Sequence, residues 1–87
     1  MRERTIEAYL VKRVTEMGGE VRKVTWIART GAPDRLVMLP GQTVWVELKA
    51  PSKKPTTRQL REHARMRAMG QAVVVIDSLD AVDELLS

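Results

Sequence analysis

The chain has 87 residues, no cysteine, 3% aromatic residues and a net charge of +4. A chain of this length predicts one small domain over residues 1–87, and the absence of cysteine excludes a disulfide scaffold and favours a reducing compartment. Residues 1–70 contain 15 basic and 7 acidic residues, a balance of +8, so we expect a polyanionic partner. The scarcity of aromatic side chains favours contacts with phosphates over stacking on bases.

The first half of the chain predicts a helix followed by three strands. Apolar residues recur at helical spacing over residues 4–17, and the glycines that follow are typical of a C-terminal cap. Residues 20–28 are rich in β-branched residues and predict a first strand, which the Gly and Pro of residues 29–33 end. Residues 35–39 and 43–49 then predict a β-hairpin with a Pro-Gly turn, so we expect three antiparallel strands after the first helix.

The second half predicts a loop, a helix, a strand and a short helix. The prolines predict a basic loop from residue 50, in which no helix can begin before Pro55. The helix predicted over residues 57–69 ends at Gly70. Residues 72–76 are continuously apolar, as in a strand buried on both faces in the middle of a sheet, and Ser78 is a candidate cap for a last helix. The order αβββαβα predicts a single α/β domain.

Targeting and membrane segments are not predicted. The first residues lack the apolar core of a signal peptide, and no stretch approaches the roughly 18 apolar residues of a membrane span. We therefore expect a soluble, cytoplasmic protein that contacts no membrane.

Residues 44–49, VWVELK, alternate between the two faces of the second hairpin strand. Val44, Val46 and Leu48 share one face, and Trp45, Glu47 and Lys49 share the other. By itself, an acid with a lysine is also typical of an exposed cross-strand salt bridge of little consequence. If the hairpin pairs through its turn at residues 40–42, however, Asp34 lies beside Glu47 at the same end of the neighbouring strand.

Glu7 is a further acid in an unusual place. It falls on the flank of the apolar face of the first helix, between Val11 and Val14, where an unpaired carboxylate is costly. Either it reaches water beside Arg4 or Arg13, or it approaches the carboxylates of the hairpin from the side.

The convergence of Asp34, Glu47 and Lys49 is typical of a metal-dependent phosphodiesterase. Mg²⁺ is usually held by one or two carboxylates while it engages phosphate oxygens, and we expect Mn²⁺ to substitute for it. A bound ion polarises the phosphate and lowers the pKa of a water molecule, and a nearby lysine can orient that water or stabilise charge on the phosphate. Without a cation, carboxylates this close repel each other and one pKa rises.

Pro33-Asp34 followed by Glu47-Leu48-Lys49, in an αβββαβ order, resembles the motif of the PD-(D/E)XK nuclease superfamily. Within that superfamily, GAPD, VELKAP and TTRQL make nearly the whole chain similar to a stand-alone VRR-NUC domain, the virus-type replication and repair nuclease module. The resemblance implies a central mixed β-sheet flanked by helices, and a DNA substrate. The site residues that it implies are Asp34 and Glu47 as metal ligands, the Leu48 backbone carbonyl as a further ligand, Lys49 as the catalytic lysine, Glu7 as the helical acid and Gln59 as the glutamine of the second helix.

One position departs from the family pattern, and two others bear on the assignment of roles. Glu3 lies one turn before Glu7 on a similar face and is a weaker rival for the role of helical acid. Arg35 stands where an apolar residue is expected after the aspartate, and in a regular strand its side chain points to the opposite face from Asp34. It therefore bears on the packing rather than on the metal site. His63, the only histidine, is assigned no catalytic role.

A basic surface is predicted on and before the second helix. Arg58, Arg61 and Arg65 form a narrow stripe on that helix, and Lys53 and Lys54 precede it in the loop. These five residues are the candidate contacts for DNA phosphates, although such a stripe is also typical of a solvated helix face.

These features predict a Mg²⁺-dependent DNA endonuclease that acts on branched DNA such as four-way junctions or flaps. The leading alternative is a non-catalytic DNA-binding or assembly module that keeps the fold. A small ribosomal or RNA-binding protein also fits the charge but leaves the carboxylates unexplained. Because the core is thin and symmetric cleavage of a junction requires two sites, we also expect a homodimer.

Overall fold

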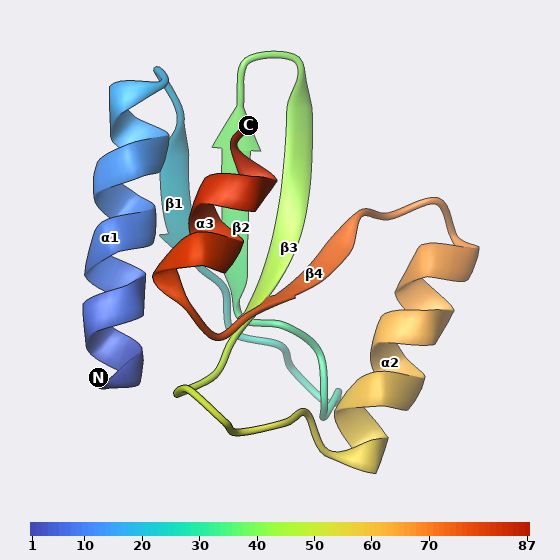
Figure 1. Cartoon of the computed structure of the whole chain (residues 1–87). Coiled ribbons are helices and arrows are strands. Elements are labelled where there is room, and N and C mark those ends of the chain that lie inside the picture. Colours follow the sequence, from blue (N-terminus) through green and yellow to red (C-terminus); the bar gives the residue numbers. More distant parts are fainter.

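The computed structural model describes residues 1–87 and contains one four-stranded sheet with three helices (Figure 1). The elements are, in chain order, α1 (Glu3–Glu16), β1 (Glu20–Lys23), β2 (Arg35–Leu39), β3 (Gln42–Leu48), α2 (Thr57–Ala68), β4 (Val73–Ile76) and α3 (Leu79–Leu85). The strand order is β1-β2-β3-β4, in which the first three strands are antiparallel and β4 runs parallel to β3. The predicted element order and mixed sheet are therefore confirmed. None of the helices has the length and apolarity that a membrane crossing requires.

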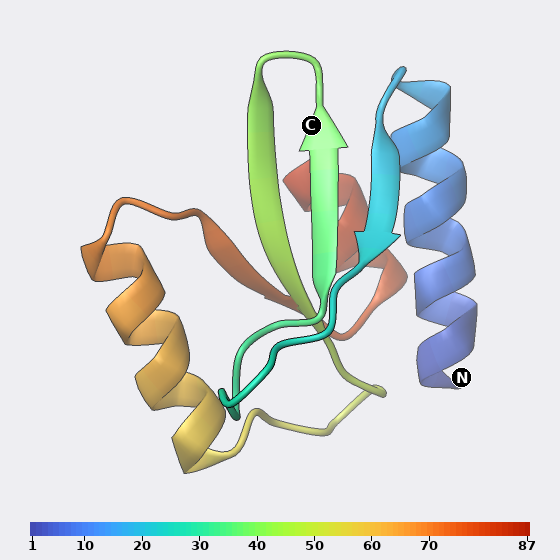
Figure 2. The same ribbon diagram turned by 180° about the vertical axis from the view of Figure 1, so that it is seen from behind.

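One face of the sheet carries the hydrophobic core, covered by α1 and α3. Its buried apolar side chains are Ile6, Leu10, Val14, Val37, Val44, Val46, Leu48, Ile76, Val82 and Leu86. In α1 they recur every four residues and in β3 every second residue, which are the spacings that bring side chains to one face of a helix and of a strand. α3 lies in front of the sheet in Figure 1 and behind it in Figure 2, so it covers this face together with α1.

The β2–β3 hairpin has the predicted Pro-Gly turn, but it turns through two residues, Pro40 and Gly41, rather than through residues 40–42, because Gln42 already belongs to β3. Leu39 pairs with Gln42, and Gly41 has a φ of 86°, a left-handed conformation that glycine adopts without strain. Because this short turn sets the register, the partner of each β2 residue on β3 is determined.

β4 differs from the prediction in its position. The expectation that residues 72–76 lie in the middle of the sheet is wrong, because β4 pairs only with β3 and forms an edge. Its apolar character has another cause, because side chains on both of its faces are buried: Ile76 faces the core, and Val73, on the opposite face, is 5% exposed. Arg67 of α2 lies on the Val73 side and donates from Nη2 to the Val73 carbonyl at 2.8 Å. Helices therefore cover both faces of an edge strand.

The first strand is shorter than predicted, since β1 ends at Lys23 rather than at residue 28. Beyond it, Trp26 packs against Trp45 of β3 with ring centroids 5.1 Å apart, and its Nε1 donates to the Pro33 carbonyl at 2.8 Å. Residues 24–34 are consequently a loop that folds over the face of the sheet opposite the core, the face that carries Trp45 and Glu47.

Candidate active site

Asp34 and Glu47 face each other across the β2–β3 hairpin. Arg35 pairs with Val46 in the observed register, which places Asp34 and Glu47 opposite each other at the next position. Alternation along the strands puts both side chains on the face opposite the core. Their predicted convergence is confirmed at the level of the backbone register, and it follows directly from the two-residue turn of the hairpin.

Glu47 is a buried carboxylate with a strongly perturbed pKa. Its residue is only 8% exposed, and burial raises the pKa of its carboxyl group from the ordinary 4.5 to about 7. Lys49 opposes this increase in pKa, whereas the negative charges of Asp34 and Glu3 add to it. Near neutral pH the protein therefore holds a carboxylate that a nearby cation would stabilise.

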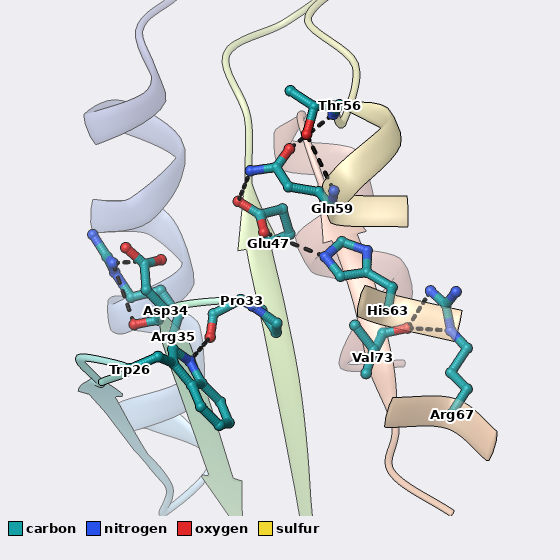
Figure 3. Close-up of polar contacts among 10 residues, drawn as sticks. All are labelled: Trp26, Pro33, Asp34, Arg35, Glu47, Thr56, Gln59, His63, Arg67 and Val73. Atoms are coloured by element: carbon teal, nitrogen blue, oxygen red, sulfur yellow. Dashed lines mark hydrogen bonds and ion pairs between the residues drawn. The ribbon is translucent and has the colours of Figure 1, made fainter. Parts of the chain in front are cut away.

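Gln59 reaches Glu47 because its orientation is determined by the cap of α2. The Thr56 hydroxyl accepts a hydrogen bond from the backbone N–H of Gln59 at 3.1 Å. In return, the side-chain oxygen Oε1 of Gln59 accepts one from the backbone N–H of Thr56 at 2.9 Å. This reciprocal capping box occupies the oxygen of the Gln59 side chain. Its Nε2 is left to donate to Glu47 Oε2 at 3.4 Å, as Figure 3 shows.

His63 contacts the other oxygen of Glu47, a role that the sequence did not predict. It lies one turn after Gln59 on α2, is completely buried, and places Nε2 3.3 Å from Glu47 Oε1 (Figure 3). Burial lowers the pKa of His63, and the charge of Arg67 lowers it further, which favours the neutral ring near pH 7. The tautomer of the neutral ring decides whether Nε2 donates to Glu47 or accepts from its protonated carboxyl group. His63 Nδ1 has no hydrogen-bond partner. The spacing of Gln59 and His63 on one helix face was the available signal.

Arg35 forms ion pairs with both Glu7 and Asp34 and so connects α1 to the acid before β2. Its guanidinium forms an ion pair with Glu7 of α1, and its Nη1 lies 2.9 Å from Asp34 Oδ1. Arg35 leaves the strand on the opposite face from Asp34, as predicted, because it pairs with the core-facing Val46 and its guanidinium meets Glu7 of α1. The end of its long side chain nevertheless reaches the Asp34 carboxylate, which the sequence did not predict. Its contact with Glu7 explains how an acid is tolerated on the flank of the apolar face of α1.

Glu7 and Glu3 are the two α1 acids that compete for the role of helical acid, and they differ in their contacts. Glu7 is engaged by Arg35, whereas Glu3 is the α1 residue whose charge raises the pKa of Glu47. No group of three or more His, Cys, Asp or Glu side chains is arranged to hold a metal ion. The roles of Glu7 and of its rival Glu3 remain predictions.

Lys49 has no ion-pair or hydrogen-bond partner for its ammonium group, although its charge acts on Glu47. The Leu48 side chain is buried in the core. At the next residue, the backbone amide of Lys49 donates to the Ile76 carbonyl at 2.9 Å. This bond joins the end of β3 to the end of β4. Lys53 and Lys54 lie exposed in the loop between β3 and α2.

Comparisons with known proteins bear on this arrangement. No family model matches the chain. A solved structure described as a "VRR_NUC domain" superposes with a TM-score of 0.88 at 43% sequence identity, over 97% of this chain and 92% of that one. The chain belongs to the VRR-NUC family. It is also 52% identical over 81 residues to "Putative nuclease p44" of Acyrthosiphon pisum secondary endosymbiont phage 1, which is 92% of this chain and 87% of that protein.

Membership of the VRR-NUC family confirms the resemblance and the fold expected from the sequence. It also agrees with the position of Asp34, Glu47 and Lys49 at one end of the β2–β3 hairpin. The roles assigned to individual residues remain predictions of the family motif, and the structure adds His63 and Arg35 to the residues that surround it.

Proposed function

We propose that this VRR-NUC domain is a DNA endonuclease that uses Mg²⁺, or Mn²⁺ in its place, to hydrolyse phosphodiester bonds in branched DNA. The observation that carries the proposal is a buried acid, Glu47, which lies opposite Asp34 with its pKa raised to about 7, two residues before an unpaired lysine. A structural salt bridge would instead show Lys49 paired with Glu47 and a lowered carboxyl pKa.

The residues present fit a divalent cation. Asp34 and Glu47 offer carboxylate oxygens and Leu48 a backbone carbonyl, and Mg²⁺ typically takes one or two carboxylates while it keeps several water ligands. Burial raises the pKa of Glu47, and the charges of Asp34 and Glu3 add to the rise. A bound cation would stabilise the ionised carboxylate against both effects. When bound, the ion polarises the phosphate and lowers the pKa of a water molecule.

The chain itself supplies orientation and charge. Gln59 and His63 each contact one oxygen of Glu47, so the carboxylate is held between β3 and α2. Arg35 holds Asp34 from the opposite side through Nη1. Lys49, which has no competing partner, is free to place its ammonium group on a phosphate oxygen or on the attacking water.

The substrate is proposed to be DNA because phosphates are the groups that this surface can bind. Lys53 and Lys54 lie exposed in the loop that connects β3 to α2, next to the site. Such lysines contribute contacts that position a nucleic acid without reading its sequence. A structure-selective nuclease requires this type of contact rather than base recognition.

A homodimer is proposed as the working form. β4 leaves one edge unpaired, and beside it lies a groove of about 290 Å³ with five hydrophobic lining residues, Val74, Val75, Ile76, Ala81 and Leu85. Such an edge is a ready surface for a second subunit. Light scattering should give about twice the monomer mass at micromolar concentration, and Leu85→Lys should reduce it to the monomer. A wild-type protein that is monomeric there contradicts the dimer.

The function is tested by incubating labelled linear duplex, flap and four-way junction DNA with the protein, with Mg²⁺ and with a chelator. We expect cleavage of the branched substrates only with Mg²⁺, and none by Lys49→Ala. The alternative of a non-catalytic DNA-binding module predicts binding without cleavage under all of these conditions. Cleavage that persists in the chelator contradicts a metal-dependent mechanism.

A further inference from the structure

Four arginines from two distant parts of the chain line one cavity. Arg29, in the loop after β1, joins the stripe of Arg58, Arg61 and Arg65 on α2 around a volume of about 280 Å³, with Ala28 and Thr30 completing the lining. Both ribbon views show the tip of this loop beside the first turns of α2 (Figure 2). The sequence predicted the stripe but not the contribution of Arg29.

The loop and the helix are joined closely, so the cavity is a built feature. A Cβ atom on Gly31 would lie 2.9 Å from the Arg58 carbonyl oxygen, and Gly31 has a φ of +84°, which side chains rarely adopt. Arg58 Nη1 also donates to the Thr30 hydroxyl at 3.3 Å. Glycine is therefore required where the loop touches α2.

The positive charge of this cavity is only partly neutralised. Glu62, which is 4% exposed, accepts hydrogen bonds from Arg65 at 2.7 and 2.9 Å and lies 3.4 Å from Arg29. Glu62 is the only carboxylate that forms an ion pair with any of the four arginines, and Arg58 and Arg61 form none. Like charges this close on a helix are destabilising, so an anion in the cavity would relieve the repulsion.

The cavity lies on a different side of α2 from the active site. At about 100° per residue, the stripe of Arg58, Arg61 and Arg65 is directed well away from Gln59 and His63, which contact Glu47. An α-helix with its side chains is roughly 10–12 Å wide. A phosphate bound by the arginines is therefore not the phosphate that is cut.

We propose that the four-arginine cavity binds a backbone phosphate of a second DNA segment, the arm of a branched substrate other than the one cleaved at Glu47. Arginine suits this ligand because its planar fork of donors matches phosphate oxygens. The proposal rests on the proposed function in that the substrate is DNA. It adds the means by which a domain of this size distinguishes a branch from a linear duplex.

The test measures binding of a labelled four-way junction and of a linear duplex of equal length, in chelator so that nothing is cut. The variant combines Arg29→Ala with Arg61→Ala, and the control is Lys12→Ala, an exposed charge on α1. We expect about a tenfold or greater loss of junction affinity and less than threefold for the duplex. The slope of log affinity against log salt should fall by about 1–2, because each lost phosphate contact reduces it by roughly 0.9.

Three results would overturn the proposal. One is a double variant that binds the junction as tightly as the Lys12→Ala control. Another is an equal loss of affinity for junction and duplex. The third is a cavity that binds only free phosphate. In that case inorganic phosphate raises the melting temperature of the wild type but not of the double variant, and the two proteins bind the junction equally well.

The design separates this proposal from the nuclease function. If the wild-type protein shows a cavity-dependent preference for the junction but never cuts it with Mg²⁺, the nuclease function fails and the cavity is retained. If the wild type cuts and the double variant binds like the control, the cavity fails and the nuclease is retained. Arg61→Ala alone breaks no ion pair and should keep the wild-type melting temperature, so a loss of junction affinity in that variant cannot come from unfolding. A fully folded Arg61→Ala variant that binds the junction as the wild type does contradicts the proposal.

Discussion

Replacing Glu47 by Gln should abolish cleavage and at the same time stabilise the metal-free protein. In the wild type, burial and the charges of Asp34 and Glu3 raise the pKa of Glu47 to about 7, while Lys49 opposes them. The folded state therefore binds more protons than the unfolded state between pH 4.5 and about 7, and the free energy of unfolding falls as the pH rises through this window. Glu47→Gln has no such ionisation and should not show the decline.

The magnitude follows from the pKa and from the exposure of the site. A full shift from 4.5 to about 7 would correspond to roughly 3 kcal/mol, at 1.36 kcal/mol per unit. Water reaches the rim of the site, because the side chain of Asp34 is 58% exposed, so we expect about 1–2 kcal/mol. The contacts of Glu47 with Gln59 and His63, at 3.4 and 3.3 Å, are long. In Glu47→Gln the amide oxygen can accept from Gln59 Nε2, and the amide NH2 group can donate to His63 Nε2 in the neutral tautomer that carries its proton on Nδ1.

Thermal unfolding from pH 4 to 8, with and without Mg²⁺, measures both effects. At pH 8 without metal, Glu47→Gln should melt about 4–8 °C higher than the wild type for each kcal/mol gained. Added Mg²⁺ should raise the melting temperature of the wild type alone, because a ligand stabilises only the state that binds it. Glu16→Gln, an exposed acid on α1, is the control and should behave as the wild type. The reasoning is refuted if Glu47→Gln cuts DNA at near the wild-type rate, or if its stability falls with pH as the wild type's does.

Three other substitutions test the remaining parts of the site. Lys49→Ala should stop cleavage but keep the Mg²⁺-induced rise in melting temperature, since an ammonium is not a ligand; loss of that rise would assign Lys49 to metal binding instead. Gln59→Glu keeps an acceptor for the capping box but adds a charge beside Glu47. The free energy of unfolding of the metal-free protein should therefore fall by about 1 kcal/mol at pH 8 and recover with Mg²⁺. Equal stability with and without Mg²⁺ contradicts this. Trp26→Phe removes the donor to the Pro33 carbonyl, so unfolding should cost about 1 kcal/mol less and cleavage should slow while DNA affinity is unchanged; an unaltered cleavage rate would show that the loop is positioned without this bond.

Local rules were sufficient for much of the fold and for the backbone of the site. The two-residue turn at Pro40-Gly41 and the alternation of β3 together determine that Asp34 faces Glu47. The α2 boundary was equally predictable, because Thr56 and Gln59 form a capping box that depends on adjacent residues alone.

The contacts that sequence patterns missed all depend on how elements dock. His63 meets Glu47 because α2 packs beside that part of β3. The spacing of Gln59 and His63 indicates that they share a helix face, but it does not indicate which residue that face contacts. Arg35 contacts both Glu7 of α1 and Asp34 because its long side chain extends beyond the strand face on which it begins, and this reach depends on where α1 docks. Arg29 joins the α2 stripe because its loop folds against α2, and no pattern within the loop predicts that approach.

The central claim is that Asp34 and Glu47 hold a divalent cation, and a calorimetric titration with Mg²⁺, repeated with Mn²⁺, tests it most directly. The wild-type protein should show saturable binding that releases protons near pH 7, because the cation displaces the proton that Glu47 carries there. Glu47→Gln should show no saturable binding. A wild-type protein with no saturable site for either ion, or a Glu47→Gln variant that binds both ions as the wild type does, contradicts the account.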